Sequence, residues 1–291
     1  LMNMEIAVIS GKGGTGKSFV SAAFATIPER VFLSDCDVDA ANLYLIFSPE
    51  INFEQIYIAG QKAEIDYNKC TNCGYCVDFC RFDAMSIKDS KVVINETLCD
   101  GCHLCARICP ENAITMLDND KSRMYAGTFR NGQMVYGRLA PGEENSGKLV
   151  SMIREKAKTE IIKGKFKIHI IDGPPGIGCA TISSITGVDR VVIVTEPTLS
   201  GIHDLKRTVE LVSKFDLKTW VIINKYDLNT SMSLEIENYC KENNILFAGK
   251  IPFDKQVVEA MMNCKSIIEY RPKSEVSKII TDIFNKIQHA N

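Results

Sequence analysis

Residues 11–18 read Gly11-Lys12-Gly13-Gly14-Thr15-Gly16-Lys17-Ser18. This octapeptide fits the phosphate-binding pattern G-x4-G-K-S/T, and it lies between an apolar strand at 6–9 and a helix at 20–27. Backbone N–H groups of such a loop surround phosphate oxygens, and the helix that follows adds its positive end. We expect Lys17 to reach the β- and γ-phosphates and Ser18 to hold Mg²⁺. The predicted binding residues of the loop are Gly11, Gly13, Gly14, Thr15, Gly16 and Ser18.

The segments on either side of this loop indicate an α/β fold. A strand-like apolar run at 31–33 follows the predicted helix, and from about 167 onward helix-length amphipathic stretches separate further runs at 168–171, 191–194, 220–223 and 245–247. Near-continuous apolar strands are typical of a parallel sheet that is covered on both faces. We therefore expect a mostly parallel sheet whose first βαβ unit carries the phosphate-binding loop.

Two acidic segments accompany the loop. The stretch Asp35-Cys36-Asp37-Val38-Asp39 follows the second predicted strand, and Asp172-Gly173-Pro174-Pro175-Gly176 follows the strand at 168–171. Because ligands of parallel sheets bind beyond the carboxyl ends of the strands, these carboxylates are candidates for the same site.

Lys12 distinguishes this loop from a plain phosphate-binding loop, and with it the chain resembles the deviant P-loop ATPases, which include MinD, ParA, the nitrogenase iron protein and the Mrp-type proteins. The resemblance implies that Lys12 crosses a homodimer closed by ATP to the partner's phosphates. It also implies that Asp37 orients the attacking water, and that Asp35 and Asp172 support Mg²⁺ directly or through its waters. The alternative for Lys12 is a solvated loop lysine.

Two motifs near the C-terminus resemble contacts to the base and ribose of a nucleotide. They are Asn224-Lys225-Tyr226-Asp227 and Ile251-Pro252-Phe253-Asp254, each at the end of a predicted strand. Asn-Lys-x-Asp is also the guanine-reading signature of GTPases. The rest of the chain resembles the ATP-binding branch, so ATP is the expected nucleotide, and the residues implied for it are Asn224, Pro252 and Asp254.

Eight of the twelve cysteines form two copies of one spacing, C-x2-C-x2-C-x3-C. This spacing suits iron–sulfur clusters better than disulfides, because the short gaps let ligands converge on one centre. Zinc is the competing metal, although it would leave half of each run unused. The two runs are Cys70-Cys73-Cys76-Cys80 and Cys99-Cys102-Cys105-Cys109.

The runs resemble those of bacterial two-cluster ferredoxins, in which the fourth cysteine of each run binds the other cluster. The resemblance implies one [4Fe–4S] cluster held by Cys70, Cys73, Cys76 and Cys109, and a second held by Cys99, Cys102, Cys105 and Cys80. Pro110 follows the second run as in ferredoxins, whereas Arg81 stands at the matching place after the first.

The cysteine region interrupts the rhythm of the sheet. We expect an inserted α+β ferredoxin-like domain at 63–118, with two halves that repeat, and a P-loop ATPase domain made of 1–62 and 119–291. The segment 124–150 has the weakest pattern of secondary structure. It contains a predicted hairpin at 128–135 and a loop at 141–148 that either caps a helix at 149–162 or forms a docking or second anion site.

Composition restricts the class of protein. The 291 residues carry a formal charge of −2 without a basic stripe, so nucleic acid is not an expected partner. No apolar run is long enough to span a bilayer, and the reduced thiols suit the cytoplasm. Leu1 to Asn3 precede Met4, which is the expected natural start.

The combination of motifs leads to one principal hypothesis and two others. The first is an ATPase whose dimer closure gates electron transfer through the ferredoxin module, or its docking, to a partner metalloprotein. The second is an ATP-dependent iron–sulfur or metallocluster carrier, although Cys240 and Cys264 do not form the C-terminal Cys-x-x-Cys of Mrp-type carriers. The third is a positional regulator similar to MinD, for which the apolar stripe of the helix at 275–289 would have to bind a membrane.

Overall fold

The structure is a computed structural model of the chain and describes residues 4–290, so that Leu1 to Asn3 lie outside the described residues. The chain divides into two compact units. The sheet unit comprises the chain up to Glu54, Tyr125–Gly137 and the chain from Gly147 onward, and the cysteine unit comprises Gln55–Met124 and Arg138–Ser146. The cysteine unit therefore extends beyond the predicted insertion at 63–118 on both sides and includes a separate loop.

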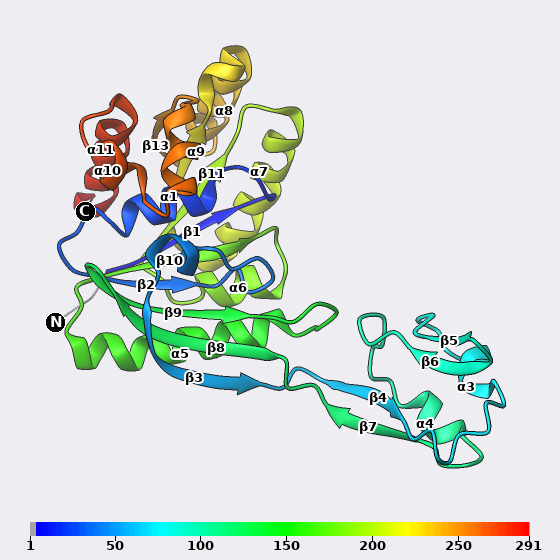
Figure 1. Cartoon of the computed structure of the whole chain (residues 1–291). Coiled ribbons are helices and arrows are strands. Elements are labelled where there is room, and N and C mark those ends of the chain that lie inside the picture. Colours follow the sequence, from blue (N-terminus) through cyan, green and yellow to red (C-terminus); the bar gives the residue numbers. More distant parts are fainter. Residues whose placement is uncertain (1–3, 291) are drawn as a thin grey trace. The chain divides into compact units, whose positions relative to one another are not determined.

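Nine strands of residues 4–290 form the large sheet (Figure 1), in the order β13-β12-β11-β1-β10-β2-β9-β8-β3. The first seven strands in this order are parallel to their neighbours. The strands are β1 (Met4–Ser10), β2 (Val31–Asp35), β3 (Glu50–Tyr57), β8 (Ser122–Phe129), β9 (Gly132–Arg138), β10 (Ile168–Pro175), β11 (Arg190–Thr195), β12 (Lys218–Asn224) and β13 (Leu246–Ile251). The mostly parallel α/β sheet expected from the apolar runs is confirmed.

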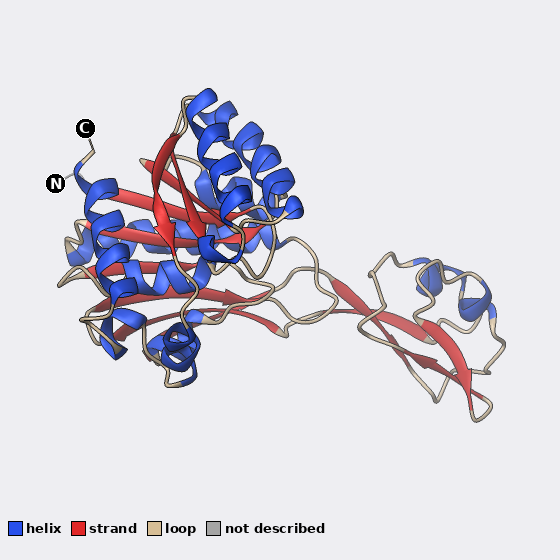
Figure 2. Cartoon of the chain, turned by 90° about the horizontal axis from the view of Figure 1, so that it is seen from above, coloured by secondary structure: helices blue, strands red, loops and turns tan. Residues whose placement is uncertain are grey.

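Helices lie on both faces of this sheet (Figure 2), because successive residues of a strand point to opposite faces. Ile6 and Val8 of β1 belong to a core that also includes Val20 of α1 and Ile280 of α11. On the opposite face α6 packs against β1 and β10, and α7 packs against β11. The helices of the unit are α1 (Lys17–Phe24), α2 (Leu43–Phe47), α5 (Ser146–Gly164), α6 (Cys179–Ile185), α7 (Leu199–Val212), α8 (Thr230–Glu242), α9 (Lys255–Met262), α10 (Ile267–Tyr270) and α11 (Glu275–His289). Short 3₁₀ turns occupy Ser213–Phe215 and Tyr226–Leu228.

The cysteine unit has two small antiparallel sheets. One pairs β4 (Gln61–Ile65) with β7 (Ile114–Asp118), and the other pairs β5 (Met85–Lys88) with β6 (Lys91–Ile94). A short helix lies within each cysteine run, α3 (Tyr75–Asp78) in the first and α4 (Leu104–Ile108) in the second. Each run is followed by a strand, so the repeat seen in the sequence is also a repeat of secondary structure.

The segment at 124–150 is resolved into three parts. The predicted hairpin is formed by β8 and β9, which are neighbours in the sheet. Helix α5 begins at Ser146, three residues earlier than expected. The residues between β9 and α5 group with the cysteine unit, which the sequence did not predict.

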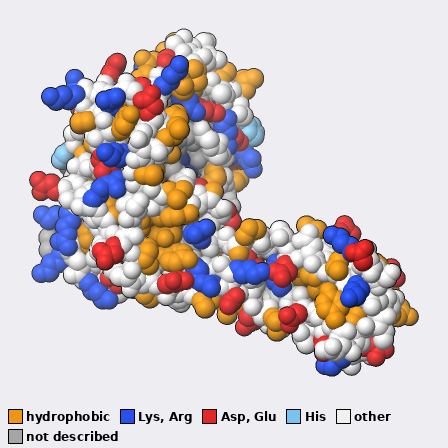
Figure 3. Space-filling model, viewed as in Figure 1, with side chains coloured by type: hydrophobic (Ala, Val, Ile, Leu, Met, Phe, Trp, Pro, Cys, Tyr) orange, Lys and Arg blue, Asp and Glu red, His pale blue; other side chains and the backbone are white. Residues whose placement is uncertain are grey.

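Surface charge is mixed on the face drawn in Figure 3, where Lys and Arg side chains are interspersed with Asp and Glu. Among residues 4–290, none of the helices has the length and hydropathy needed to cross a membrane.

Candidate functional site

The phosphate-binding loop joins the end of β1 to α1 and depends on glycine at three positions. Gly14 and Gly16 have φ of 84° and 91°, in the left-handed region that side chains with a Cβ rarely adopt. At Gly11, a Cβ would lie 2.6 Å from the backbone oxygen of Asp204. These positions therefore explain the glycine spacing of the motif without reference to any ligand.

Lys17, Ser18 and Asp172 come together at the start of α1. The Lys17 Nζ lies 2.9 Å from Asp172 Oδ1, and the Ser18 hydroxyl donates to Asp172 Oδ2 at 2.9 Å. Ser21, one helical turn later, donates to Asp172 Oδ1 at 2.6 Å. Asp172 is fully buried in β10, next to β1, so the sheet register brings these groups together. The arrangement can bind a phosphate and a hard cation, because ammonium, hydroxyl and carboxylate groups meet at one point.

Asp37 contributes a second carboxylate, 3.3 Å from the Lys17 Nζ. Burial, and to a smaller extent the charge of Asp172, raises the pKa of Asp37 above its ordinary value. Burial by itself would lower the pKa of Lys17, but Asp172 and Asp37 reverse this and raise it. Lys17 is therefore held as an ammonium ion between two acidic groups.

Asp35 has a different environment from the other two aspartates. Its carboxylate accepts the backbone N–H groups of Asp37, Asn42 and Leu43 at 3.1–3.2 Å. Burial, together with the nearby Asp172, raises the pKa of Asp35 to about 7. The structure thus uses Asp35 to hold the turn that carries Asp37, and its predicted part in supporting Mg²⁺ stays a prediction.

Lys12 is bound within its own chain at the beginning of α7. Its Nζ lies 2.7 Å from Glu196 Oε1 and donates to Ser200 Oγ at 2.8 Å. The Thr198 hydroxyl, which caps α7, lies 3.3 Å from the same Nζ. Lys12 is consequently not a freely solvated loop lysine in this structure.

The residues predicted to contact the base occupy three kinds of position. Asn224 is buried at the end of β12 and donates to the Thr15 carbonyl at 2.8 Å, so it holds the phosphate-binding loop. Asp254 caps α9 by accepting from the Gln256 N–H, and Pro252 directly follows β13. All three lie at or beyond the carboxyl ends of parallel strands, and their contact with a base stays a prediction.

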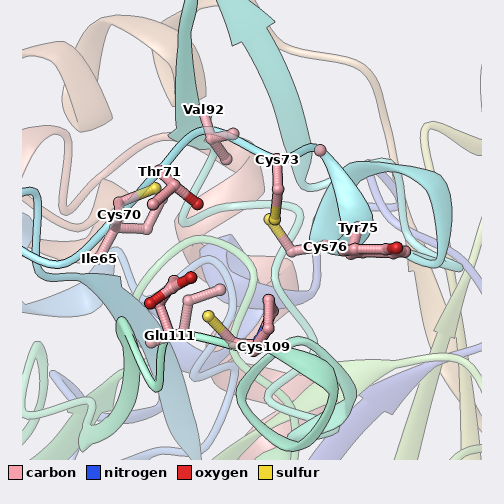
Figure 4. A pocket seen from close by; sticks show the side chains of 12 residues that line it. Ile65, Cys70, Thr71, Cys73, Tyr75, Cys76, Val92, Cys109 and Glu111 are labelled. Carbon is pink, nitrogen blue, oxygen red and sulfur yellow. The ribbon is translucent and has the colours of Figure 1, made fainter.

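The eight cysteines of the two runs line two cavities, and each cavity takes three cysteines from one run and the fourth from the other. Apolar side chains that include Ile65, Val92 and Ile114 form the wall of the first cavity, which is drawn in Figure 4. The cysteines of the first cavity are Cys70, Cys73, Cys76 and Cys109. Those of the second are Cys80, Cys99, Cys102 and Cys105.

The chemistry of the donor sets fits a multi-iron cluster better than a single ion. Among residues 4–290 there is no group of three or more His, Cys, Asp or Glu side chains suited to one metal ion. Four cysteines around a cavity differ from such a group, because each thiolate of a [4Fe–4S] cluster binds a different iron and the sulfurs stand apart. Each cavity thus has the four thiols that an expected cluster requires, and the clusters themselves stay a prediction.

Cys36 and Cys179 lie near the nucleotide motifs and outside the two cysteine runs. Cys36 is fully buried, and burial raises its pKa, which disfavours the thiolate. Cys179 is exposed at the start of α6.

Sequence reasoning missed several residues of the site. Glu196 and Ser200 hold Lys12, and Ser21 bonds Asp172. A signal for Glu196 was present, since it is an acidic residue two positions after the apolar run at 191–194. The contacts of Ser21 with a residue 151 positions away carried no such signal.

Comparison with protein families supplies a match over most of the chain. Residues 6–267 match the family described as the CobQ/CobB/MinD/ParA nucleotide binding domain. An uncharacterized protein of Methanocaldococcus jannaschii is 36% identical over 298 residues, covering 98% of this chain and 96% of that protein. The septum site-determining protein MinD of Bacillus subtilis is 22% identical, covering 98% of this chain and 89% of its own.

Solved structures show the same fold at lower identity. The septum site-determining protein MinD of Pyrococcus horikoshii, complexed with Mg-ADP, is 18% identical with a TM-score of 0.62, and 99% of this chain and 97% of that chain are covered. The cell division ATPase MinD of Pyrococcus furiosus is 17% identical with a TM-score of 0.60, covering 99% of both chains.

Proposed function

The chain belongs to the CobQ/CobB/MinD/ParA nucleotide-binding family and is a P-loop ATPase, and from this premise we propose that ATP-driven closure of a homodimer gates an iron–sulfur module in the cysteine unit. The gated event is electron transfer to a partner metalloprotein or docking of the module on it. ATP with Mg²⁺ is the proposed nucleotide, in keeping with the Mg-ADP complex of the Pyrococcus horikoshii protein.

In the nucleotide site, the ammonium of Lys17 is placed to neutralise the β- and γ-phosphates, and the Ser18 hydroxyl and Asp172 carboxylate offer oxygens to Mg²⁺. Asp37 lies close enough to the Lys17 Nζ, at 3.3 Å, to orient a water at the γ-phosphate. Thr15 Oγ1 is buried and, among residues 4–290, without a hydrogen-bond partner, which supports a ligand at the loop. Asn224, Pro252 and Asp254 are the proposed contacts to the base and ribose.

Lys12 is the proposed link between two copies of the chain. Glu196 and Ser200 hold its ammonium in the structure, so closure on a partner's phosphates requires these contacts to be exchanged. A phosphate carries more charge than the single carboxylate of Glu196, and this favours the exchange when ATP is bound.

One observation carries the iron–sulfur part of the proposal, namely that two cavities are each lined by four cysteines, with the fourth from the opposite run. Bound clusters would supply one-electron chemistry. The chain contributes four thiolates to each, a largely apolar wall, and one exposed cysteine per cavity, Cys73 and Cys102. The proposed domains are an ATPase domain of 1–62 and 119–291 with the ferredoxin-like insertion at 63–118.

The order of the motifs supports gating. The insertion enters after the first acidic segment, which ends at Asp39, and leaves before the second, which begins at Asp172. Movement of either segment with nucleotide can therefore act on the strands that continue into the cysteine unit, since β3 and β8 are shared by the chain stretches of both units.

The test is an anaerobic redox titration followed by EPR, with and without MgATP under non-hydrolysing conditions. We expect the cluster potentials to shift with nucleotide, and cluster reduction to change ATP affinity by the reciprocal factor. Identical titration curves would contradict thermodynamic coupling, and iron-free protein after reconstitution would contradict the module itself. ATP-dependent dimerisation of a Lys12→Ala variant would contradict the proposed role of Lys12 in the dimer interface.

Exposure of Cys73 and Cys102 favours a second candidate, ATP-dependent transfer of a cluster to another protein. A solvent-accessible ligand can be replaced by an incoming thiolate. Transfer of iron to an apo-protein, faster with ATP than without, would distinguish this candidate from electron transfer. The positional role of MinD is a third candidate, and ATP-dependent sedimentation with liposomes would support it.

A further inference from the structure

Lys62, the second residue of β4, bonds two backbone carbonyls that are far from it in sequence. Its Nζ donates to the Cys99 carbonyl at 2.7 Å and to the Gly142 carbonyl at 2.9 Å. The same Nζ lies 3.4 Å from Glu143 Oε1, and the side chains of Lys62 and Glu143 are 13% and 2% exposed. An ammonium with three oxygen partners and little solvent is fixed in place, unlike a lysine on an open surface.

The loop that supplies Gly142 and Glu143 packs on the segment leading to Cys99. Gly142 has φ of 74°, and a Cβ there would collide with the Thr97 carbonyl. Asn119 donates its amide to Glu143, and the Ala140 N–H donates to Ser122 Oγ at 2.9 Å. Several contacts therefore hold the 138–146 loop against the rest of the cysteine unit.

The internal repeat provides a comparison for Lys62. When Cys70 is matched with Cys99, Asp66 matches Asn95, and both begin the same turn. Asp66 accepts from the N–H two residues later at 3.0 Å, and Asn95 does so at 3.1 Å. Lys91 then occupies the place of Lys62, but its side chain is exposed. The two halves thus share the turn before each cysteine run. They differ in the contacts of the matching lysines, since Lys62 bonds the Cys99 carbonyl and Lys91 is exposed.

We propose that Lys62 is a positioning residue for the second cluster, because its ammonium ties the backbone carbonyl of Cys99 to that of Gly142 in the 138–146 loop. Groups that orient a metal ligand from outside contribute to how tightly the metal is held. The second cluster is therefore the better retained of the two. This inference rests on the proposed clusters.

The experiment measures iron release to a chelator from the anaerobically reconstituted full chain. Lys62→Met keeps the aliphatic stem and removes the ammonium, and Lys91→Met makes the same change at the matching place. We expect Lys62→Met to accelerate release of half of the iron about tenfold and to alter the EPR signal of one cluster. Lys91→Met should leave both readouts as in the wild type.

Glu143→Gln distinguishes the hydrogen bonds that Lys62 donates to the two carbonyls from its ion pair with Glu143. It removes the carboxylate but leaves the donations of Lys62 to Cys99 and Gly142, so the second cluster should stay as inert as in the wild type. Equal release from Lys62→Met and Lys91→Met, or equal acceleration of all the iron, overturns the inference while leaving the clusters in place. A wild-type chain that takes up no iron overturns the iron–sulfur proposal as well.

Discussion

The sheet unit and the cysteine unit build their sites in opposite ways. In the sheet unit, Asp35 at the end of β2 and Asp172 within β10 are fully buried, and apolar residues of the same strands belong to a large core. In the cysteine unit, one hydrophobic cluster has seven buried residues, one of which is Cys99, and other cysteines pack against it. The core of the sheet unit is thus formed mainly by residues outside the nucleotide site. In the cysteine unit, by contrast, the cysteines are themselves part of the core or pack against it.

This difference predicts how each unit responds to loss of its ligand. A small core supplies little stability, and ligation of the proposed clusters would then contribute to the folding of the cysteine unit. A wide parallel sheet buries enough apolar surface to remain folded without nucleotide.

The largest expected effect is on the apo-protein. Removal of iron should abolish amide protection in the cysteine unit, because its few buried residues cannot offset the conformational entropy of the loops. Protection of β1 and β10 in the sheet unit should remain. Hydrogen exchange with mass spectrometry checks both in one sample, and equal protection of the cysteine unit with and without iron would contradict the contrast.

Paired cysteine substitutions test how the ligands are shared. Cys73→Ala with Cys109→Ala alters one cavity, so half of the iron should remain. Cys102→Ala with Cys109→Ala alters both cavities, so nearly all of the iron should be lost, although both cysteines belong to one run. Iron analysis after reconstitution distinguishes the two variants. The reverse result would mean that each run binds its own cluster.

Lys17→Met tests the independence of the sheet unit. Loss of its charge-assisted contacts should weaken MgATP binding about 100-fold, while the iron content stays unchanged. Calorimetric titration measures the affinity, and Lys214→Met, on the exposed 3₁₀ turn Ser213–Phe215, is a control for general loss of positive charge. Unchanged ATP affinity in Lys17→Met would contradict the assignment of the loop.

The smallest effect concerns pH and a buried histidine near the start of β10. His169 is fully buried, with Nε2 2.8 Å from Ser34 Oγ and Nδ1 3.4 Å from Glu5 Oε1. Burial lowers its pKa, although Glu5 opposes the shift. The unfolded chain, with an ordinary pKa of about 6.5, therefore binds a proton that the folded chain does not.

The contribution of His169 to the free energy of unfolding is fully present above about pH 6.5. It decreases as the pH falls below 6.5, by at most about 1.4 kcal/mol per pH unit for one proton. Burial tends to raise the pKa of Glu5, but His169 and Arg154 lower it to about 2, so its contribution is lost in the same direction below about pH 4.5. Chemical denaturation of the sheet unit between pH 7.5 and 5.5 measures the slope. Asp35, whose pKa burial and Asp172 raise to about 7, acts in the opposite direction over this range, because the folded chain binds its proton first. His169→Gln should remove the histidine's contribution and make the slope of stability against pH more negative, and an unchanged slope would contradict the assignment to His169.

Much of the fold could be predicted because its signals are local. The apolar run at 168–171 lies within β10, which is Ile168–Pro175, and the helix at 275–289 is α11 with the predicted bounds. The glycine spacing of the loop at 11–18 followed from backbone conformations that the structure contains at Gly14 and Gly16. The bounds expected for the inserted domain stay a prediction. The two compact units divide within strands β3 and β8, where no break in composition marks the division.

The sequence by itself determined the motifs, since the chemistry of a phosphate loop or a cysteine run requires fixed residue types at short spacing. Tertiary structure alone decided which distant groups meet. The register between β1 and β10 brings Asp172 to Lys17, the start of α7 brings Glu196 to Lys12, and β4 brings Lys62 to Cys99. Such contacts join residues separated by tens to hundreds of positions, and no local pattern encodes them because the strand pairings and loop packing that create them exist only in the folded chain.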